Sequence, residues 1–372
     1  PVKVNESPNV FNTFLSLFRV QNYKKKSKHE RKTTKMLQIC EIFCNFAGFM
    51  KKKRYVVAAM ALAVALGMSA ERVVEPIPFG DFEQWTVRQI KESKILGGKT
   101  KTIYSVAPND TIIGPQVFTY GQNGNPWSVS NVYANVAGIV KASGTTRPEK
   151  REDGKGTCCR LDVRMEYVTA ANIIDINVLV PGTVFWGRTI EPVKTADDPY
   201  QNIDFGVPFT QRPTALMLDY KCKVSPEQWV WRAKGLASSK KKIKGHDECE
   251  LYMLLQHRWE DSKGKIHSIR VGTAYKRIGH SVPEWQNDVE IPVHYGDITC
   301  QPWFQPYMGL NTKPMRAMNS KGKITYINEE GWDGSLEPTH AILMLTGGCY
   351  EAFVGYDGNT LWVDNVRLVY DK

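Results

Sequence analysis

The chain has 372 residues, 49 Lys and Arg against 38 Asp and Glu, and 42% hydrophobic residues. This hydrophobic content excludes a mainly disordered chain, and a single membrane-directed run excludes a multi-span membrane protein. The net charge of +11 is uneven, because residues 1–70 carry 13 basic and 3 acidic side chains whereas residues 71–372 carry 36 and 35. Since the larger part is nearly neutral, the overall charge does not predict nucleic acid as a partner.

Residues 50–70 have the three parts of a secretory signal peptide. Basic residues follow Met50, twelve apolar residues run from Tyr55 to Leu66, and small residues precede Glu71. Twelve residues rise only about 18 Å as a helix, too short for a hydrocarbon core of roughly 30 Å. We therefore expect a secreted or periplasmic, cell-envelope protein with no stable membrane span after cleavage.

Residues 1–49 precede this signal and contain a lysine-rich tract. We interpret them as a disordered upstream extension that is not native to the mature protein, because an export signal seldom begins 49 residues into a chain. The alternative is a basic localisation or nucleic-acid-binding arm.

Residues 71–372 are predicted to form one strand-rich domain. Cys159 to Tyr167 and Cys249 to Trp259 alternate apolar and polar residues, the period of a half-buried strand. A short stretch around Gln84 to Glu92 is helix-like. Further strands are predicted at 173–180, 214–224, 266–275, 289–295, 340–345 and 360–370, and long surface loops at 107–126, 143–156, 235–247 and 311–338. Many strands without alternating helices predict an all-β fold, an antiparallel β-sandwich or jelly roll with long decorated loops.

The best local candidates for acid–base chemistry are Glu329, Glu330 and Asp333. They flank Trp332 on the last of the predicted loops, and no nucleotide-binding, phosphate-binding or common hydrolase motif competes with them. Glycoside hydrolysis needs two carboxylates facing each other across a cleft. The alternative interpretation of the three residues is a solvated acidic turn.

Aromatic residues point to a carbohydrate partner. All ten Trp fall within residues 71–372, and an exposed indole suits the C–H face of a sugar ring. Trp229 and Trp231 share one face of a predicted strand, while Trp127, Trp303 and Trp332 lie in Gly/Pro-rich loops where binding residues often occur. These five are the predicted ligand-binding residues, and the alternative for each is a place in the core.

Asp364 is a carboxylate in an otherwise apolar predicted strand. An unpaired carboxylate is costly there, so we expect either an Arg or backbone partner or a bound Ca²⁺. The segment with Glu83 could supply further carboxylates if the first and last strands are neighbours. No cofactor is otherwise required by the sequence.

Three blocks of sequence, in order, resemble a known family. They are Phe79-Gly-Asp-Phe-Glu-Gln-Trp85, Phe209-Thr-Gln-Arg-Pro213, and Phe353-Val-Gly-Tyr-Asp-Gly-Asn-Thr-Leu-Trp-Val-Asp-Asn365. With the stretches around them they are similar to the putative carbohydrate metabolism domain family, exported proteins of gut anaerobes, over most of residues 79–372. The resemblance implies a β-jelly roll and a carbohydrate context but transfers no catalytic residue. In many jelly-roll modules a first-strand Glu and a last-strand Asp bind structural Ca²⁺, and Glu83 and Asp364 occupy comparable places.

Three functions follow from these observations. The leading hypothesis is an exported module that binds an oligosaccharide or polysaccharide through aromatic stacking. The second is a glycoside hydrolase or a related carbohydrate-active enzyme that uses a carboxylate pair. The third is a structural or protein-interaction domain of the envelope, in which the aromatic residues form the core.

Overall fold

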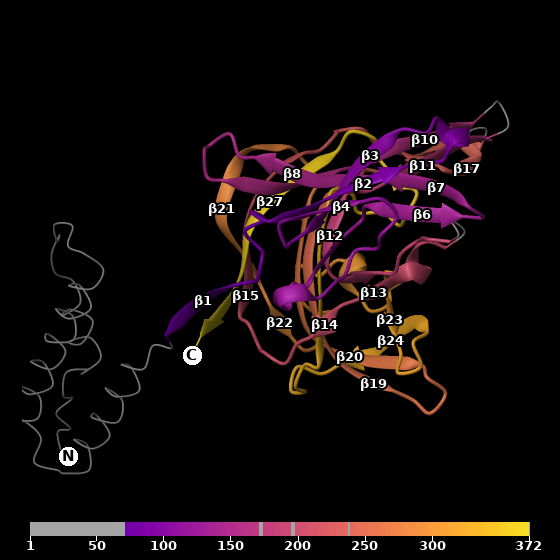
Figure 1. Cartoon of the computed structure of the whole chain (residues 1–372). Coiled ribbons are helices and arrows are strands. Elements are labelled where there is room, and N and C mark those ends of the chain that lie inside the picture. The colour runs from indigo at the N-terminus through magenta and orange to yellow at the C-terminus, as the bar shows by residue number, and fades with distance from the viewer. Residues whose placement is uncertain (1–70, 171–173, 195–197, 237–238, 372) are drawn as a thin grey trace, which may run out of the picture. The chain divides into compact units, whose positions relative to one another are not determined.

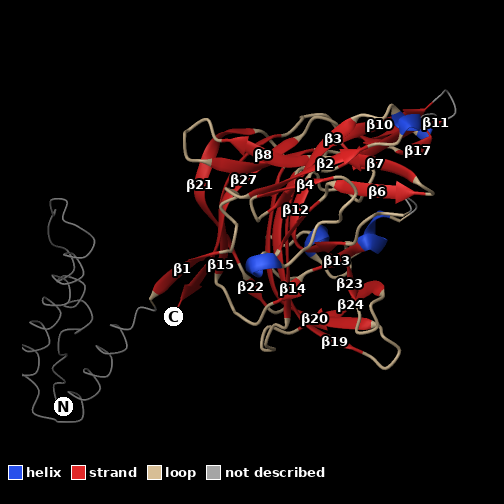
Figure 2. Cartoon of the chain, in the orientation of Figure 1, coloured by secondary structure: helices blue, strands red, loops and turns tan. Residues whose placement is uncertain are grey.

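The computed structural model describes residues 71–170, 174–194, 198–236 and 239–371. The predicted extension at 1–49 and signal peptide at 50–70 lie outside the described residues, so export stays a prediction. Strands dominate, and the helical segments are single turns (Figure 2). The turns are η1 (Lys94–Leu96), η2 (Gln122–Gly124), η3 (Pro199–Asn202) and η5 (Pro306–Met308). The prediction of an all-β fold is confirmed, and no helix among the described residues is long and apolar enough to cross a membrane.

The first large sheet brings together the two ends of the described chain. Its strand order is β21 (Val282–Pro292), β15 (Ala215–Lys223), β27 (Thr360–Asp371), β9 (Thr157–Asp162) and β8 (Thr146–Lys150), and β1 (Arg72–Pro76) also pairs with β27. All of these pairings are antiparallel. The first and last strands are therefore neighbours, although the first strand is Arg72–Pro76 and the segment with Glu83 is not a strand.

The second large sheet is built around the hairpin of β19 (Cys249–Glu260) and β20 (Ile266–Ile278). Its order is β13 (Ile203–Phe205), β12 (Thr183–Thr189), β25 (His340–Thr346), β19, β20, β24 (Ile324–Trp332) and β23 (Arg316–Met318). Three short strands join this path: β5 (Trp127–Val129), β14 (Val207–Pro208) and β22 (His294–Tyr295). β24 runs parallel to β20, whereas β25 and β19 are antiparallel.

The main core lies between the two large sheets. Alternate residues of β19 (Leu251, Met253 and Leu255) are fully buried in one cluster with Leu218 of β15 and Leu361 of β27. Tyr252 and Leu254 point to the other face of β19 and join a second buried cluster with residues of β12, β24 and β25. Because both faces of β19 are covered, its buried part reads as a nearly continuous apolar run.

The remaining strands of the described residues form four smaller sheets. They are β3 (Thr100–Val106) with β2 (Trp85–Lys91) and β4 (Asp110–Ile113); β6 (Val132–Val136) with β7 (Ile139–Ser143); β10 (Arg164–Ala170) with β11 (Ile174–Val180) and β17 (Lys234–Leu236); and β18 (Lys241–Lys244) with β16 (Trp229–Arg232) and β26 (Val354–Gly355). In Figure 1, β17 lies near the top of the domain and the β19–β20 turn lies near its bottom.

The predicted loops at 107–126, 143–156 and 235–247 contain strands β4, β8 and β18. Two further local predictions are wrong. The helix-like stretch around Gln84 to Glu92 is strand β2, because β3 and β4 supply hydrogen-bonding partners on both of its edges. The predicted loop at 311–338 contains β23 and β24, since Ile324 to Trp332 finds a parallel partner in β20. Pairing with distant strands overrode the local signal in both cases.

Candidate functional site

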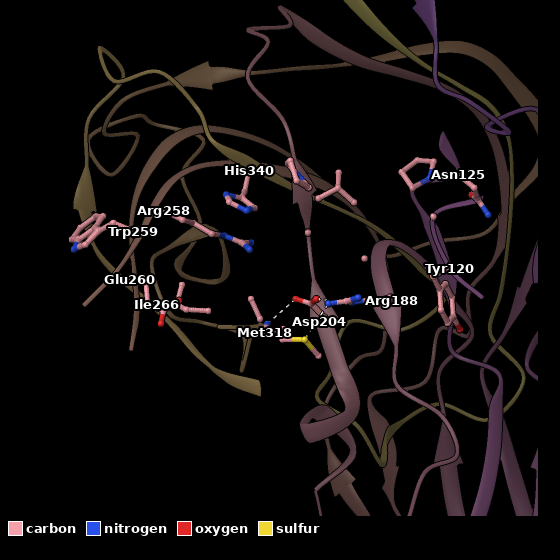
Figure 3. A pocket seen from close by; sticks show the side chains of 17 residues that line it. Tyr120, Asn125, Arg188, Asp204, Arg258, Trp259, Glu260, Ile266, Met318 and His340 are labelled. Atoms are coloured by element: carbon pink, nitrogen blue, oxygen red, sulfur yellow. Dashed lines mark hydrogen bonds and ion pairs between the residues drawn. The ribbon is translucent and has the colours of Figure 1, made fainter. Parts of the chain in front are cut away.

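A pocket of about 560 Å³ lies at the edge of the second large sheet. Figure 3 shows Trp259 and Glu260 on one side of it, Tyr120 and Asn125 on the other, and Arg258, His340 and Asp204 between them. The remaining lining residues are Gly121, Pro126, Gly187, Arg188, Gly206, Val207, Pro208, Ile266, Ala317 and Met318. A volume of this size accommodates a small ligand or a short segment of a polymer.

The rim of the pocket is formed where the β19–β20 hairpin runs past the core. Trp259 is 40% exposed, and its ring stacks on His267 with ring centroids 5.5 Å apart and planes 14° apart. Glu260 accepts hydrogen bonds of 2.7 Å from the backbone N–H and the hydroxyl of Ser320. These donors hold the pKa of Glu260 below its usual value, so the carboxylate is ionised at neutral pH.

The floor of the pocket contains a guanidinium with an unused donor. Arg258 donates to Gln256 Oε1 at 2.8 Å and to the carbonyl of Phe205 at 3.0 Å, while its Nη2 has no partner among the described residues. Burial lowers the pKa of Arg258 to about 10. The close approach requires Gly206, because a Cβ at this positive-φ position would lie 2.7 Å from Nη2 and 2.9 Å from the carbonyl oxygen of Ala341.

An ion pair fixes the wall opposite the hairpin. The carboxylate of Asp204 accepts from Arg188 Nε at 2.8 Å and from the backbone N–H of Met318 at 2.8 Å. These contacts tie β13 to β12 and to β23, the three strands from which the wall is built. The arrangement supplies oriented donors and acceptors at the pocket surface, which is what recognition of hydroxyl groups requires.

Two further groups at the pocket are neutral at physiological pH. Burial, together with the charge of Arg258, lowers the pKa of His340 to about 4. Burial and the charge of Glu191 raise the pKa of Tyr120 to about 12. An uncharged imidazole and phenol can each donate and accept hydrogen bonds, as sugar hydroxyls do.

Glu329, a predicted catalytic residue, lies behind the pocket floor. Its carboxylate accepts hydrogen bonds from Arg270 Nε at 2.6 Å and Arg270 Nη2 at 2.5 Å. It also accepts from Gln256 Nε2 at 2.7 Å. Burial opposes the charge of this carboxylate, but Arg270, Gln256 and the backbone of Asn311 outweigh it and hold its pKa below the usual value. Only a void of about 20 Å³ adjoins Glu329, too small for a sugar. Its contacts are those of a structural ion pair.

The structure does not bring the three predicted catalytic carboxylates together. Glu330 points to the other side of β24, where it contacts His267 Nδ1 at 2.5 Å, because consecutive strand residues face opposite ways. Asp333 lies beyond β24 and caps its own turn by accepting from the N–H and hydroxyl of Ser335. None of the three lines the large pocket.

Three of the predicted stacking tryptophans are scattered. Trp127 is fully buried against Phe82 and Trp186 and donates to the carbonyl of Pro78, so no ligand reaches its ring in this structure. Trp303 is 39% exposed and packs on His294 at a centroid distance of 4.3 Å. Trp332 is half-buried, with the guanidinium carbon of Arg270 5.1 Å from its ring centroid.

The other two predicted stacking residues do share a face. Trp229 and Trp231 on β16 have ring centroids 5.4 Å apart at an interplanar angle of 81°. The Nζ of Lys242 lies 3.5 Å from the centroid of Trp229, and the Nζ of Lys240 lies 4.5 Å from that of Trp231. Lysine ammonium groups therefore cover these indole rings.

Asp364 has the arginine partner that was one of its two expected alternatives. Arg151 Nη1 bridges Asp364 at 2.8 Å and Asp219 at 3.0 Å. The side chain of Glu83 accepts from the backbone N–H of Thr157 at 2.6 Å. The described residues contain no group of three or more His, Cys, Asp or Glu placed to hold a metal, and the Ca²⁺ site stays a prediction.

Sequence reasoning missed the pocket because its lining comes from nine separate stretches of chain between Tyr120 and His340. One local signal was available. Arg258, Trp259 and Glu260 place a cation, an indole and a carboxylate at the end of a long strand, just before the Asp261–Gly264 turn. An aromatic residue flanked by charges at a hairpin end favours a surface role over a core role.

The chain resembles solved structures of low sequence identity. One is described as a putative glycoside hydrolase from Bacteroides thetaiotaomicron, with 17% identity and a TM-score of 0.42 over 80% of this chain and 71% of that one. Another is a putative glycoside hydrolase from Bacteroides vulgatus, with 14% identity and a TM-score of 0.36 over 80% of this chain and 94% of that one. No curated protein matches the sequence. The profile of a family matches residues 81–288, more than half of the chain, and the protein therefore belongs to the putative carbohydrate metabolism domain family.

Proposed function

We propose that the protein binds a carbohydrate in the pocket formed by β12, β13, β19 and β23. The observation that carries the proposal is the half-exposed indole of Trp259 at the rim of a cavity whose walls hold oriented polar groups. A sugar stacks its C–H face on an aromatic ring and bonds its hydroxyls to side chains at the edge of that ring. Membership of a carbohydrate metabolism family supports the same ligand class.

Binding is supported better than hydrolysis by the carboxylates of this pocket. A glycosidase needs one carboxylic acid that stays protonated and a second carboxylate that is ionised. Glu260 is held in its ionised form by Ser320, and the carboxylate of Asp204 is occupied by Arg188 and the Met318 N–H. Neither side chain is arranged as a proton donor. One result would show that the function is hydrolysis and not binding alone. The wild type would turn over chromogenic glycosides, and Asp204→Asn would lose that turnover.

Affinity gel electrophoresis of the full chain against neutral polysaccharides tests the proposal. We expect at least one polysaccharide to retard the protein. Trp259→Ala is expected to weaken that interaction about tenfold, or by about 1.4 kcal/mol of binding free energy, because it removes the stacking ring. Trp303→Ala is the matched control, because its indole is 39% exposed but lies outside the pocket. An equal loss in both variants, or no retardation by any polysaccharide, would contradict the proposal.

A further inference from the structure

A second surface of the molecule concentrates positive charge. Residues 229–244 contain Arg232, Lys234, Lys240, Lys241, Lys242 and Lys244 and no acidic residue. None of these six basic side chains forms an ion pair within the part of the chain that the structure describes. Arginines elsewhere, such as Arg151 and Arg270, are paired with carboxylates. The charge of these six side chains is therefore not neutralised by an ion pair among the described residues, and the nearby carboxylate of Glu227 accepts instead from Trp229 Nε1 at 2.5 Å.

Strand register places lysines and tryptophans on one face. β16 pairs with β18 so that Trp229 lies opposite Lys244 and Trp231 opposite Lys242, and directly opposed residues of an antiparallel pair share a face. We call the set of Trp229, Trp231, Lys240, Lys242 and Lys244 the Lys–Trp surface. Trp231 packs on its inner side against a buried cluster that includes Val163 and Leu179, so the outer side faces the lysines.

Ammonium groups cap the two indoles from outside. Lys242 Nζ lies 3.5 Å from the centroid of Trp229 and 5.4 Å from that of Trp231, while Lys240 Nζ lies 4.5 Å from Trp231 and 5.8 Å from the exposed ring of Tyr167. Each contact is within the range of a cation–π interaction. An uncharged sugar must displace a lysine to stack here, whereas a ligand with carboxylate or sulfate groups bonds to the ammonium groups where they are.

We propose that the Lys–Trp surface is a second glycan-binding site, separate from the pocket, that takes an acidic polysaccharide. Carboxylate or sulfate groups of the polymer contact Lys240 and Lys242 where these ammonium groups cap the rings of Trp229 and Trp231. The cationic strip is short, and residues 71–372 as a whole carry a net charge of only +1. A nucleic acid, which is bound mainly through an extended positive field, is therefore a poorer partner than a sugar acid.

The test compares polygalacturonate, a sulfated glycan such as heparin and a single-stranded DNA oligomer as ligands of the full chain. We expect Lys240→Gln with Lys242→Gln to weaken binding of an acidic glycan at least tenfold. Lys99→Gln with Lys101→Gln, which removes two exposed lysines on and beside β3, is expected to change it less than twofold. Trp259→Ala is expected to leave acidic-glycan binding unchanged, which separates this site from the pocket.

Three results would overturn the proposal. One is an absence of binding to both acidic glycans, and another is an equal loss in the two lysine pairs, which would indicate unspecific attraction. The third is tighter binding of DNA than of either glycan with the same dependence on Lys240 and Lys242. Near-ultraviolet circular dichroism of each variant verifies that the fold is retained.

Discussion

The pocket and the Lys–Trp surface use aromatic rings in opposite ways. In the pocket, Trp259 rests on His267 and leaves part of its indole open at the rim of a cavity. On the Lys–Trp surface, the rings of Trp229 and Trp231 are covered by ammonium groups. The difference teaches that a tryptophan pair on a strand predicts a sugar platform only when nothing else occupies the ring faces. If both proposals hold, what lies on the ring decides between a neutral and an acidic ligand.

The largest effect is expected from the buried network that supports the pocket. Glu329→Gln removes the charge that neutralises Arg270, and breaking a buried pair in this way costs about 3–5 kcal/mol of unfolding free energy. Lys242→Gln on the exposed Lys–Trp surface is expected to change stability by less than about 0.5 kcal/mol. Urea denaturation of both variants measures the contrast. A stable Glu329→Gln protein that has lost turnover of a glycan would instead make Glu329 catalytic.

The next largest effect is expected from salt, which should weaken binding at the Lys–Trp surface much more than binding in the pocket. Raising NaCl from 50 to 500 mM is expected to weaken binding of polygalacturonate about tenfold, because the contacts of the Lys–Trp surface are between exposed charges. Binding of a neutral polysaccharide in the pocket is expected to change less than twofold. Isothermal titration calorimetry at the two salt concentrations checks both values, and a salt-dependent neutral ligand would remove the distinction between the sites.

Acidification is expected to act through the pocket. His340 has a pKa of about 4 in the folded protein, below the usual value of about 6.5 in an unfolded chain. The unfolded state therefore binds more protons between these values, and the stability that neutral His340 contributes is lost as the pH falls from about 6.5 to about 4. Allowing for partial solvent access, the loss is on the order of 1 kcal/mol.

The comparison with His340→Gln isolates this contribution. The variant is expected to lose less stability than the wild type over the same pH range in thermal or urea unfolding. Parallel curves for the two proteins would show that His340 titrates normally in the folded state.

The smallest effect is expected at Trp303. Its ring packs on His294 at the surface and touches neither site, so Trp303→Ala is expected to change unfolding free energy by about 0.5 kcal/mol or less. Neither class of glycan should bind differently. Glycan titrations of Trp303→Ala and Trp259→Ala side by side check this expectation. A loss of binding in Trp303→Ala would indicate a third aromatic contact.

Long runs with an apolar residue at every second position could be predicted well as strands. Cys249 to Trp259 was expected and Cys249–Glu260 is observed, because every second side chain faces the main core. The stretch around Gln84 was wrongly predicted as helix-like. Its polar residues include Thr86 and Arg88, which are buried by contacts with distant segments. Burial of polar groups by distant partners leaves no periodic signal.

The candidate site could be predicted much less well. The acidic run at Glu329, Glu330 and Asp333 looked like one cluster, yet strand alternation sends neighbouring carboxylates to opposite faces. The paired faces of Trp229 and Trp231 followed from their spacing, whereas the lysines above them depend on pairing of β16 with β18, which no local pattern reveals. The pocket required the strand order of the whole second sheet.

One feature of the central hairpin divides it into a buried half and an exposed half. The pairing of β19 with β20 shifts by one residue between Leu255 and Gln256, with Val271 as the extra residue on β20. Before the shift, β19 is wholly buried, and beyond it His257 to Glu260 become progressively exposed. If Trp259 and Glu260 bind a ligand as proposed, substitutions there can change the choice of ligand while the interior half keeps the scaffold intact. Substitutions at the exposed end of the hairpin are therefore expected to cost less stability than substitutions in its buried half.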